Sequence, residues 1–488
     1  MKTNIIKLFM PLLFLVIYGC GEDFLETEPT DRLSADQVAR AAEFNPDITQ
    51  GFVSGLYQLM YIPGTGGYGG DDDFGQKGVD IWSDMLSADI AHSKTDYGWY
   101  STFSALQHSV DFTASTNYMV WRYYYRIIRA ANSVIVTLGG NDAAPELAEN
   151  RHFLGQAKAM RAYAYFYLVQ LYTDRYDPAQ EILPLYIEPL VEPIAKSTTE
   201  QIYTQIYSDL NDALSLLSDF TRSQKSEINT DVVKLLLAYS YASEDKNWDQ
   251  VESLTADVIN TGGYTVLPKS QALAGMNYIT SPGWIWGSDI TIDDGISLAS
   301  FYSQMDYFTY GYASVGNNKS IDASLYAQIP ADDIRLSWFD EDDLINWRKY
   351  YDPAREWDGQ RPVVTDVHYM RIAEVYLLHA EAALKATGNT GTAAASLKTL
   401  LAERISDTSY IDAMDATQLA AEVTLQTRIE LWGEGKSYLL KRRNKMDITR
   451  GSNHLYFVGE TMPYDDNRLS LEIPQSEIQN NPFISTQN

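Results

Sequence analysis

Hydrophobic and aromatic residues cover nearly every face of residues 154–172, whose sequence is LGQAKAMRAYAYFYLVQLY. Alanines at positions 157, 159, 162 and 164 leave one half of this stretch small, and Met160, Leu168 and Leu171 add bulk at helical spacing. The pattern predicts a buried helix. Because an unpaired buried cation costs several kcal/mol, we expect Arg161 to have a buried partner and to act as a structural clamp rather than a ligand contact.

The same periodicity predicts further helices along the chain. They span residues 45–60, 121–138, 197–217, 230–242, 248–260, 367–386, 392–404 and 418–443, with a short helix that begins near Ser34. Two overlapping capping boxes precede the helix at 197–217, Ser197 with Glu200 and Thr198 with Gln201. Helix pairs joined by short turns are typical of tetratricopeptide-like stacks, although no strict 34-residue period is present.

Two stretches lack this periodicity. Residues 264–366 are rich in Gly, Ser, Asp, Trp and Tyr, which predicts a long, irregular, loop-rich insertion. Residues 62–78 hold seven glycines around Asp71, Asp72 and Asp73 and are predicted to form a loop. The aspartates lack the alternation and terminal glutamate of a helix-loop-helix calcium site, so we predict no metal there. The predicted fold class is therefore all-α with a loop-rich insertion.

The N-terminus has the pattern of an export signal. Lys2 and Lys7 flank the start of an apolar run, residues 5–18, which is shorter than the about 20 residues that span a bilayer. We predict a signal peptide over residues 1–19. The sequence IYGC at positions 17–20 resembles a bacterial lipobox, in which the cysteine is acylated. An ordinary signal peptide that happens to end near a cysteine is the alternative.

Cys20 is the only cysteine of the chain, so no disulfide can form within it. An exported chain with one thiol at the end of its signal is consistent with lipid on that sulfur. Several acyl chains hold a protein stably to a membrane, which predicts outer-membrane lipid as a partner. The residues after Cys20, Gly21-Glu22-Asp23, resemble the tag that sends lipoproteins of some Gram-negative bacteria to the cell exterior.

Charge and composition narrow the class of partner. The chain has 65 Asp and Glu against 37 Lys and Arg, a net charge of −28, and loss of Lys2 and Lys7 with residues 1–19 makes it −30. Nucleic-acid binding depends on phosphate neutralisation by basic residues, so this acidity argues against nucleic acid. Tyrosine is abundant, with 35 residues, and combines an apolar face with a hydrogen-bonding edge.

Seven stretches, taken in order, resemble the SusD/RagB family of surface lipoproteins. They are DFLETEP after Cys20, AMRAYAYFYLVQLY, IYTQIYSDLNDAL, NWDQVESLTADVINTGGYTVL, HYMRIAEVYLLHAEAAL, TRIELWGEGKSYLLKR and LEIPQSEIQNNP. The resemblance implies an all-α, SusD-like fold of tetratricopeptide-like helix pairs. It divides the mature chain into an N-terminal helical part, 20–262, and a C-terminal part with the insertion, 263–488.

The same resemblance implies a function. Members of the family are lipid-anchored on the outside of the cell, where they sit like a lid on a TonB-dependent outer-membrane transporter. Their cargo is most often a glycan. A non-catalytic, glycan-binding role is therefore the leading hypothesis. The alternatives are a surface glycoside hydrolase, which needs two carboxylates about 5 to 10 Å apart across a cleft, and a lid or scaffold for peptide cargo.

Charged residues on the predicted helices do not form an obvious catalytic site. Arg371 and Glu374 have the i,i+3 spacing of an ion pair, and Glu381 can pair with Lys385 one turn on. Arg428, Glu430 and Glu434 flank a Trp-Gly pair, where the family has the same residues without a reaction. The six histidines, at 92, 108, 152, 368, 379 and 454, lack metal-ligand spacing. We predict no catalytic residue, metal or cofactor.

Two aromatic-rich regions are the candidate ligand contacts, because sugar rings stack on exposed aromatics while carboxylates and amides hold their hydroxyls. The first region holds Asp96, Tyr97, Trp99 and Tyr100; the second, in the insertion, holds Trp284, Trp286, Tyr302, Tyr307, Tyr310 and Tyr312. The Gly/Asp loop 64–75 is a candidate border of the same surface. For each aromatic, packing in the core is the alternative, since Trp and Tyr are usually largely buried.

Overall fold

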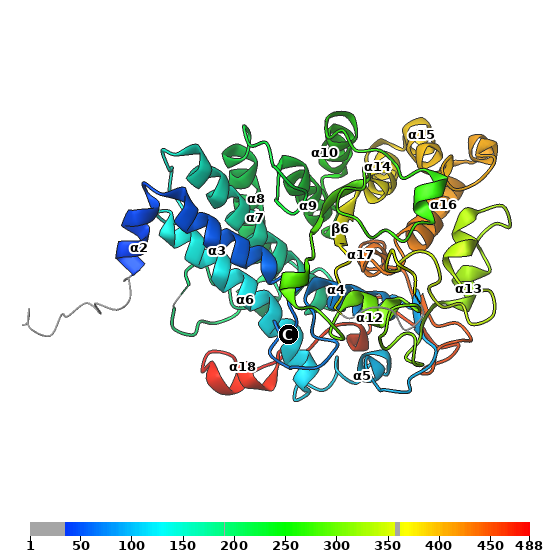
Figure 1. The fold of residues 1–488 in the computed structure, drawn as a ribbon, viewed down its shortest axis with the longest axis horizontal. Coiled ribbons are helices and arrows are strands. Elements are labelled where there is room, and N and C mark those ends of the chain that lie inside the picture. The colour runs from blue at the N-terminus through cyan, green and yellow to red at the C-terminus, as the bar shows by residue number, and fades with distance from the viewer. Residues whose placement is uncertain (1–34, 190, 357–361) are drawn as a thin grey trace, which may run out of the picture.

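The computed structural model of the chain describes residues 35–189, 191–356 and 362–488 (Figure 1). The predicted signal peptide and the predicted acylation site Cys20 lie outside the described residues. No helix within the three described ranges is long and apolar enough to cross a membrane.

Most of the described chain that is regular is helical. The longer helices are α3 (Pro46–Gln58), α4 (Gln76–Leu86), α6 (Ser115–Thr137), α7 (Ala148–Leu171), α8 (Thr199–Leu216), α9 (Thr230–Ser243), α10 (Trp248–Thr261), α14 (Ile372–Thr387), α15 (Thr390–Leu401) and α16 (Ala416–Glu430). The short ones are α2 (Ala35–Ala42), α5 (Ser101–Ser104), α11 (Lys269–Ala272), α12 (Phe301–Met305), α13 (Ala323–Tyr326), α17 (Lys436–Arg443) and α18 (Gln475–Asn480).

The strands are short and form antiparallel pairs. The pairs are β1 (Ile90–His92) with β5 (Lys319–Ile321), β2 (Glu181–Leu183) with β3 (Ser197–Thr198), β4 (Trp284–Ser288) with β6 (Val367–Arg371), and β7 (Ile448–Thr449) with β8 (Thr461–Met462). In the part of the chain that is described, no sheet exceeds two strands. The predicted all-α class is therefore confirmed.

Neighbouring helices pack side by side in a long stack. Each of α6, α7, α8, α9, α10, α14 and α15 contacts the next along this series, and the stack fills the upper part of Figure 1. Of the two predicted capping boxes at the start of α8, the structure contains that of Thr198 with Gln201. At Gly155 of α7, an added Cβ would lie 2.8 Å from Leu217 Cγ, so the missing side chain lets α7 and the end of α8 approach closely.

Arg161 is clamped as expected. Its Nε and Nη2 donate to the two carboxylate oxygens of Asp209 at 2.8 and 2.6 Å, and its Nη1 donates to Asn132 Oδ1 at 2.8 Å. Both Arg161 and Asp209 are buried. The side chain therefore ties α7 to α8 and α6, and the prediction of a structural role is confirmed.

The irregular insertion begins and ends beside the stack. Strand β4, near its start, pairs with β6, immediately after its end, with Gly287 opposite His368 and Ser288 opposite Val367. This pairing corrects the predicted helix at 367–386, because residues 367–371 are extended and the helix begins only at Ile372.

The predicted helix at 418–443 is also two helices. It is interrupted after Glu430, and α17 begins at Lys436. Gly433 and Gly435 lie between them with φ of 80° and 70°, values that L residues rarely adopt and that a helix does not contain. Added Cβ atoms would lie 2.8 Å from the Tyr350 ring and 2.9 Å from Asp80 Oδ1, so neighbouring segments pack closely on these glycines.

The main hydrophobic core extends from Val53 to Ile484 and includes residues on both sides of the predicted boundary at 262/263. A second, smaller core lies under α14, α15 and α16 and contains Leu377, Leu397 and Leu419. The division of the chain at this boundary remains a prediction.

Candidate functional site

Four of the ten predicted ligand contacts are buried, which corrects the prediction for Tyr100, Trp284, Trp286 and Tyr302. Both tryptophans lie on β4. Trp286 packs on Tyr163 and Tyr369 with ring centroids 5.4 and 4.9 Å apart, and its Nε1 donates to a backbone carbonyl. Their rings therefore have no free face for a sugar.

The two buried tyrosines donate their hydroxyls to backbone carbonyls. Tyr100 donates to Gly78 at 3.2 Å, and Tyr302 donates to Met276 at 3.2 Å and to Asp366 at 3.0 Å. These contacts satisfy the phenolic groups inside the protein, as buried tyrosines require. For these four residues, core packing was the correct alternative.

The other six predicted contacts reach the surface. The exposed fraction is 60% for Tyr97 and 42% for Tyr310, and Asp96 is also exposed. Trp99, Tyr307 and Tyr312 are partly buried. These residues remain candidates for contact with a ligand.

Strand pairing explains why the two predicted regions meet. Beyond the β1–β5 pair, the chain continues as a ladder, in which Asn318 N donates to Lys94 O at 2.9 Å and Asp96 N donates to Gly316 O at 3.0 Å. Residues 93–99 therefore run beside residues 312–318, which come more than 200 positions later in the sequence.

Three aromatic rings come together on this ladder, and we call Tyr97, Trp99 and Tyr312 the aromatic cluster. The Tyr312 ring centroid lies 5.5 Å from that of Tyr97 and 5.8 Å from that of Trp99, both edge to face. The Tyr312 hydroxyl donates to the Asp71 carboxylate, and Gln304 Nε2 donates to the Asp71 carbonyl at 3.1 Å. The Gly/Asp loop thus borders the aromatic cluster.

A cleft of about 820 Å³ adjoins the ladder, and none of the three rings of the aromatic cluster lines it. Lys94 and Gly316 from the ladder line one part of it, and Tyr307, Asp343 and His454 line others. Lys94 Nζ lies 3.1 Å from Asp96 Oδ2, and both side chains are exposed. The surface thus combines aromatic faces with carboxylates, a composition suited to holding a hydroxyl-rich ring.

Buried polar groups support this surface from behind. Lys319 Nζ donates to the Asn317 carbonyl at 3.2 Å and to Gln304 Oε1, and lies 5.0 Å from the Tyr100 ring centroid. Burial lowers the pKa of Lys319 well below its usual value and raises the pKa of Asp72 to about 7. These groups pack inside the protein and do not face a ligand.

A second aromatic surface was not predicted. The Arg355 guanidinium lies 4.1 Å from the Phe308 ring centroid, 4.4 Å from that of Tyr351 and 5.5 Å from that of Trp347. Tyr307 lies next to Trp347, with centroids 5.9 Å apart. No local spacing relates Phe308 to Trp347, so sequence periodicity had no means of pairing them.

Asp73 holds the Gly/Asp loop in shape. Asp73 accepts hydrogen bonds from the backbone nitrogens of Gly66 at 2.8 Å and Tyr68 at 3.2 Å. Within residues 35–189, 191–356 and 362–488, no group of three or more His, Cys, Asp or Glu residues is arranged to hold a metal ion.

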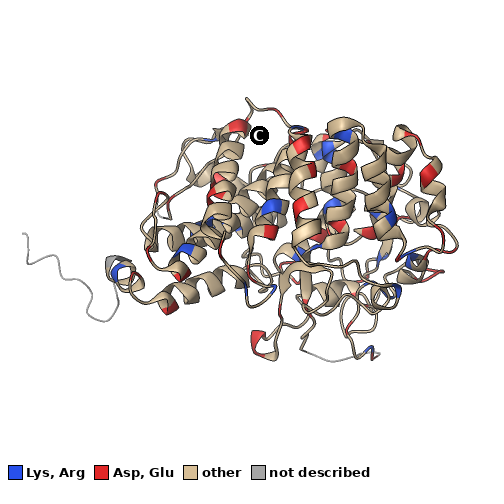
Figure 2. Cartoon of the chain, turned by 90° about the horizontal axis from the view of Figure 1, so that it is seen from above, with Lys and Arg blue, Asp and Glu red and all other residues tan. Residues whose placement is uncertain are grey.

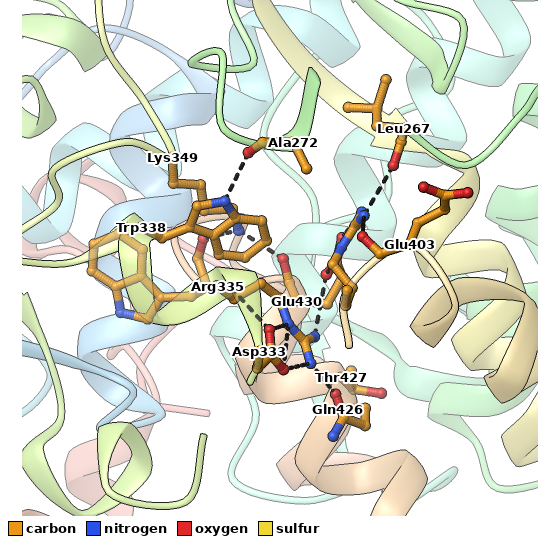
Figure 3. A network of polar contacts seen from close by, with 12 residues as sticks. Leu267, Ala272, Asp333, Arg335, Trp338, Lys349, Glu403, Gln426, Thr427 and Glu430 are labelled. Atoms are coloured by element: carbon orange, nitrogen blue, oxygen red, sulfur yellow. Dashed lines mark hydrogen bonds and ion pairs between the residues drawn. The ribbon is translucent and has the colours of Figure 1, made fainter. Parts of the chain in front are cut away.

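Glu430 lies in a buried network of charged residues, and Figure 3 shows it with Asp333, Arg335 and Lys349. The predicted ion pair of Arg371 with Glu374 is wrong. The Arg371 guanidinium binds Glu430 and Glu434, while only its backbone N–H donates to Glu374, at 2.8 Å. Glu381 contacts Lys385 at 4.0 Å, but its shorter partner is Arg443, at 2.6 Å. Burial and full pairing give this network a structural role.

Two family models match the chain in succession. A SusD-like model described as starch-binding associating with outer membrane matches residues 77–243, and the SusD family model, SusD/RagB, matches residues 276–488. Together they cover more than three quarters of the sequence. The chain belongs to the SusD/RagB family.

A curated SusD relative gives the same assignment at lower coverage. The chain is 24% identical over 298 residues to a SusD-like protein, P25, of Formosa agariphila. The match covers 60% of this chain and 53% of the relative, so the chain spans about half the length of that relative.

Solved SusD structures share the fold. A SusD-like carbohydrate binding protein from Bacteroides vulgatus has a TM-score of 0.75 at 22% identity, over 90% of this chain and 96% of that one. A SusD superfamily protein from Bacteroides thetaiotaomicron also has a TM-score of 0.75, at 23% identity, over 91% of this chain and 99% of that one. The SusD-like fold predicted from the sequence is therefore confirmed.

Proposed function

We propose that this SusD/RagB protein captures an oligo- or polysaccharide at the cell surface and passes it unaltered to a TonB-dependent outer-membrane transporter. The family description, starch-binding associating with outer membrane, supports a glycan ligand and an outer-membrane location. A structural relative from Bacteroides vulgatus is described as a carbohydrate binding protein, which supports the same ligand class.

The observation that carries the proposal is the aromatic cluster, which lies on the ladder that also borders the cleft. Tyr97 is 60% exposed, and Tyr312 and Trp99 pack beside it. A pyranose ring can stack on such faces through its C–H groups, while Asp96 and the groups that line the cleft accept or donate hydrogen bonds to its hydroxyls. The cluster lies on loops held by a strand ladder, so its geometry is fixed before a ligand binds.

Titration calorimetry of the full chain in detergent tests this proposal against a panel of oligo- and polysaccharides. We expect a binder with micromolar to millimolar affinity and about a tenfold loss in Trp99→Ala, because the substitution removes a large aromatic contact face. Tyr278→Ala is the control, because Tyr278 is 53% exposed and lies outside the cluster and the cleft. Equal losses in the two variants would overturn the site.

The same samples separate binding from catalysis. Chromatography of the bound saccharide after long incubation with the protein should return it at its original size. Shorter products would favour the glycoside hydrolase alternative, and binding of peptides without any saccharide would favour a peptide lid.

Surface attachment is the second part of the proposal. Residues 1–19 are removed as a signal peptide, Cys20 carries acyl chains, and the protein faces the cell exterior. Mass spectrometry of the membrane-extracted protein should show acyl groups on Cys20, and external protease should digest it on intact cells. A soluble periplasmic protein without lipid would contradict this part.

The transporter is the third part. Extraction of the membrane in mild detergent should recover the protein together with a TonB-dependent transporter. Recovery of the protein alone after chemical crosslinking on intact cells would leave capture standing and contradict the transfer step.

A further inference from the structure

A separate cavity of about 420 Å³ lies against α6, away from the residues of the cleft and the aromatic cluster. We call it the arginine cavity, after Arg122, Arg126 and Arg129, which line it from α6. Residue Tyr186 of the segment before α8 and Glu477 of α18 line other parts, and Figure 1 shows α18 close to α6.

The three arginines share one face of α6. Their spacing of four and then three residues places them one above the other along the helix. Among the described residues, none of the three forms an ion pair. Arg126 Nη1 donates instead to the Thr65 carbonyl at 2.8 Å, and Arg129 is exposed.

The three arginines form a basic group in a protein that is acidic overall. The chain has 65 acidic and 37 basic residues, and Figure 2 shows acidic segments distributed over the ribbon. The two glutamates that line the cavity are held by amides, with Asn481 Nδ2 2.9 Å from Glu477 Oε1 and Asn141 Nδ2 3.4 Å from Glu188 Oε1. None of the three arginines is in an ion pair with a described residue, and three arginines against two glutamates give the cavity lining a net charge of +1 in an acidic molecule.

Aromatic rings from α6 and from the segment before α8 form an aromatic wall beside the guanidinium groups of the arginine cavity. Trp121 and Tyr125 pack with ring centroids 4.7 Å apart, and Tyr186 lies 6.0 Å from Tyr125. The Tyr125 hydroxyl donates to the Pro184 carbonyl at 2.8 Å, which fixes its ring. The cavity thus offers apolar faces and guanidinium donors together.

We propose that the arginine cavity binds an anionic saccharide, one that carries a carboxylate or a sulfate. The planar guanidinium group matches both anions with two parallel N–H donors, and the aromatic wall suits the sugar ring. A neutral sugar would leave the arginine charges unused. The inference deepens the proposed glycan capture by naming the class of ligand.

The Gly/Asp loop connects the arginine cavity with the aromatic cluster. On one side, the Thr65 carbonyl of the loop accepts a hydrogen bond from Arg126. On the other, the Asp71 carboxylate accepts a hydrogen bond from the Tyr312 hydroxyl. An added Cβ at Gly67 would lie 1.3 Å from Arg122 Nη1, so this guanidinium also rests on the loop. A polymer long enough to cross the loop would contact both surfaces, whereas a short oligosaccharide would occupy one.

Titration calorimetry of the full chain in detergent tests the inference with three short probes. They are an oligogalacturonate, a chondroitin sulfate oligosaccharide and a maltooligosaccharide of the same length. We expect one or both anionic probes to bind at least tenfold more tightly than the neutral one. Which anionic probe binds identifies the carboxylate or the sulfate as the recognised group. Raising NaCl from 50 to 500 mM should weaken the binding of the anionic probes and leave that of the neutral probe unchanged, because salt screens exposed charges.

Charge-neutralising variants locate the binding. Arg129→Gln and Arg122→Gln should each weaken the anionic probe about tenfold or more, since a hydrogen bond to a charged group is worth about 1.5–3 kcal/mol. Arg40→Gln is the matched control, because Arg40 is exposed on α2 and outside the cavity. An Arg129→Gln effect no larger than that of Arg40→Gln would overturn the inference, as would tighter binding of a polyglutamate peptide than of either anionic saccharide.

The Trp99→Ala variant distinguishes binding at the arginine cavity from binding at the aromatic cluster. It should leave the short anionic probe unaffected, because that probe occupies the arginine cavity alone. If a neutral glycan binds at the aromatic cluster and no anionic probe binds, the inference fails and the proposed function stands. If the anionic probe binds and is insensitive to both arginine variants, the arginine cavity is not its site.

Discussion

Arg371 and Glu430 meet in the centre of the protein, where Arg371 Nη1 donates a 2.6 Å hydrogen bond to Glu430 Oε1 and both side chains are buried. Arg404 and Arg335 also bind this carboxylate, at 2.9 and 3.2 Å. Burial alone would raise the pKa of Glu430, but the charges of Arg404 and Arg371 hold it well below its usual range. One carboxylate thus joins the insertion, β6 and the end of α15 to α16.

Glu430→Gln should destabilise the protein strongly. The change leaves three buried guanidinium groups without their shared counter-charge, and breaking a buried ion pair costs about 3–5 kcal/mol. Urea unfolding monitored by circular dichroism gives the free energy of unfolding. Glu341→Gln, an exposed change in the insertion, is the control and should alter it by less than about 0.5 kcal/mol. Equal effects would show that the network does not stabilise the fold.

Asp84 should make stability fall as pH rises. Burial and the nearby Asp89 raise the pKa of Asp84 to about 8, although it accepts a 2.6 Å hydrogen bond from Gly433 N. Because the folded pKa lies above the unfolded value near 3.9, its contribution is fully present below about pH 4 and is lost as pH rises to about 8.

Asp84→Asn removes this titration and is the variant that checks it. Between pH 5 and 8, the variant should gain about 1 kcal/mol per pH unit in unfolding free energy relative to the wild type. Urea unfolding at several pH values measures the difference. In Asp342→Asn, at an exposed position, the unfolding free energy should depend on pH as it does in the wild type. If Asp84→Asn also showed the wild-type pH dependence, the raised pKa of Asp84 would be contradicted.

Hydrophobic periodicity and the cost of burying an unpaired charge were enough to predict most helices of the stack. The Ala-rich pattern of residues 154–172 specifies a buried helix locally, and the energetic cost of an unpaired cation required the partner that Arg161 finds in Asp209. These conclusions needed no knowledge of the rest of the fold.

Contacts between distant segments were beyond such reasoning. Local spacing favoured Glu374 as the partner of Arg371, but Arg371 is extended at the end of β6, and its guanidinium reaches residues about 60 positions later. Trp284 and Trp286 were candidates for ligand contact because their strand was not recognised, and both are buried. The aromatic cluster likewise depends on the β1–β5 pairing, which no local pattern encodes.

Gly435→Ala should disrupt the junction of α16 and α17. Gly435 has φ of 70°, and an added Cβ would lie 3.0 Å from the Asp80 Cα, so the substitution meets both backbone strain and a clash. The expected loss in unfolding free energy is about 2 kcal/mol or more. Gly459→Ala separates the two effects, because Gly459 has φ of 73° with no atom near the added Cβ, and it should cost about 1 kcal/mol. Thermal unfolding in which the two variants lose the same stability would exclude the clash.

Tyr312→Phe tests whether the hydrogen bond to Asp71 fixes the aromatic cluster. The change keeps the ring that packs against Tyr97 and Trp99 but removes the hydroxyl that joins it to the Gly/Asp loop. We expect the best-bound saccharide of the panel to bind about fivefold more weakly, with less than about 1 kcal/mol lost from the free energy of unfolding. Tyr410→Phe is the matched control, since the exposed Tyr410 hydroxyl also donates to a carboxylate, that of Glu422, at 2.6 Å. Unchanged affinity in Tyr312→Phe, or an equal loss in Tyr410→Phe, would show that the loop does not hold the cluster in its binding geometry.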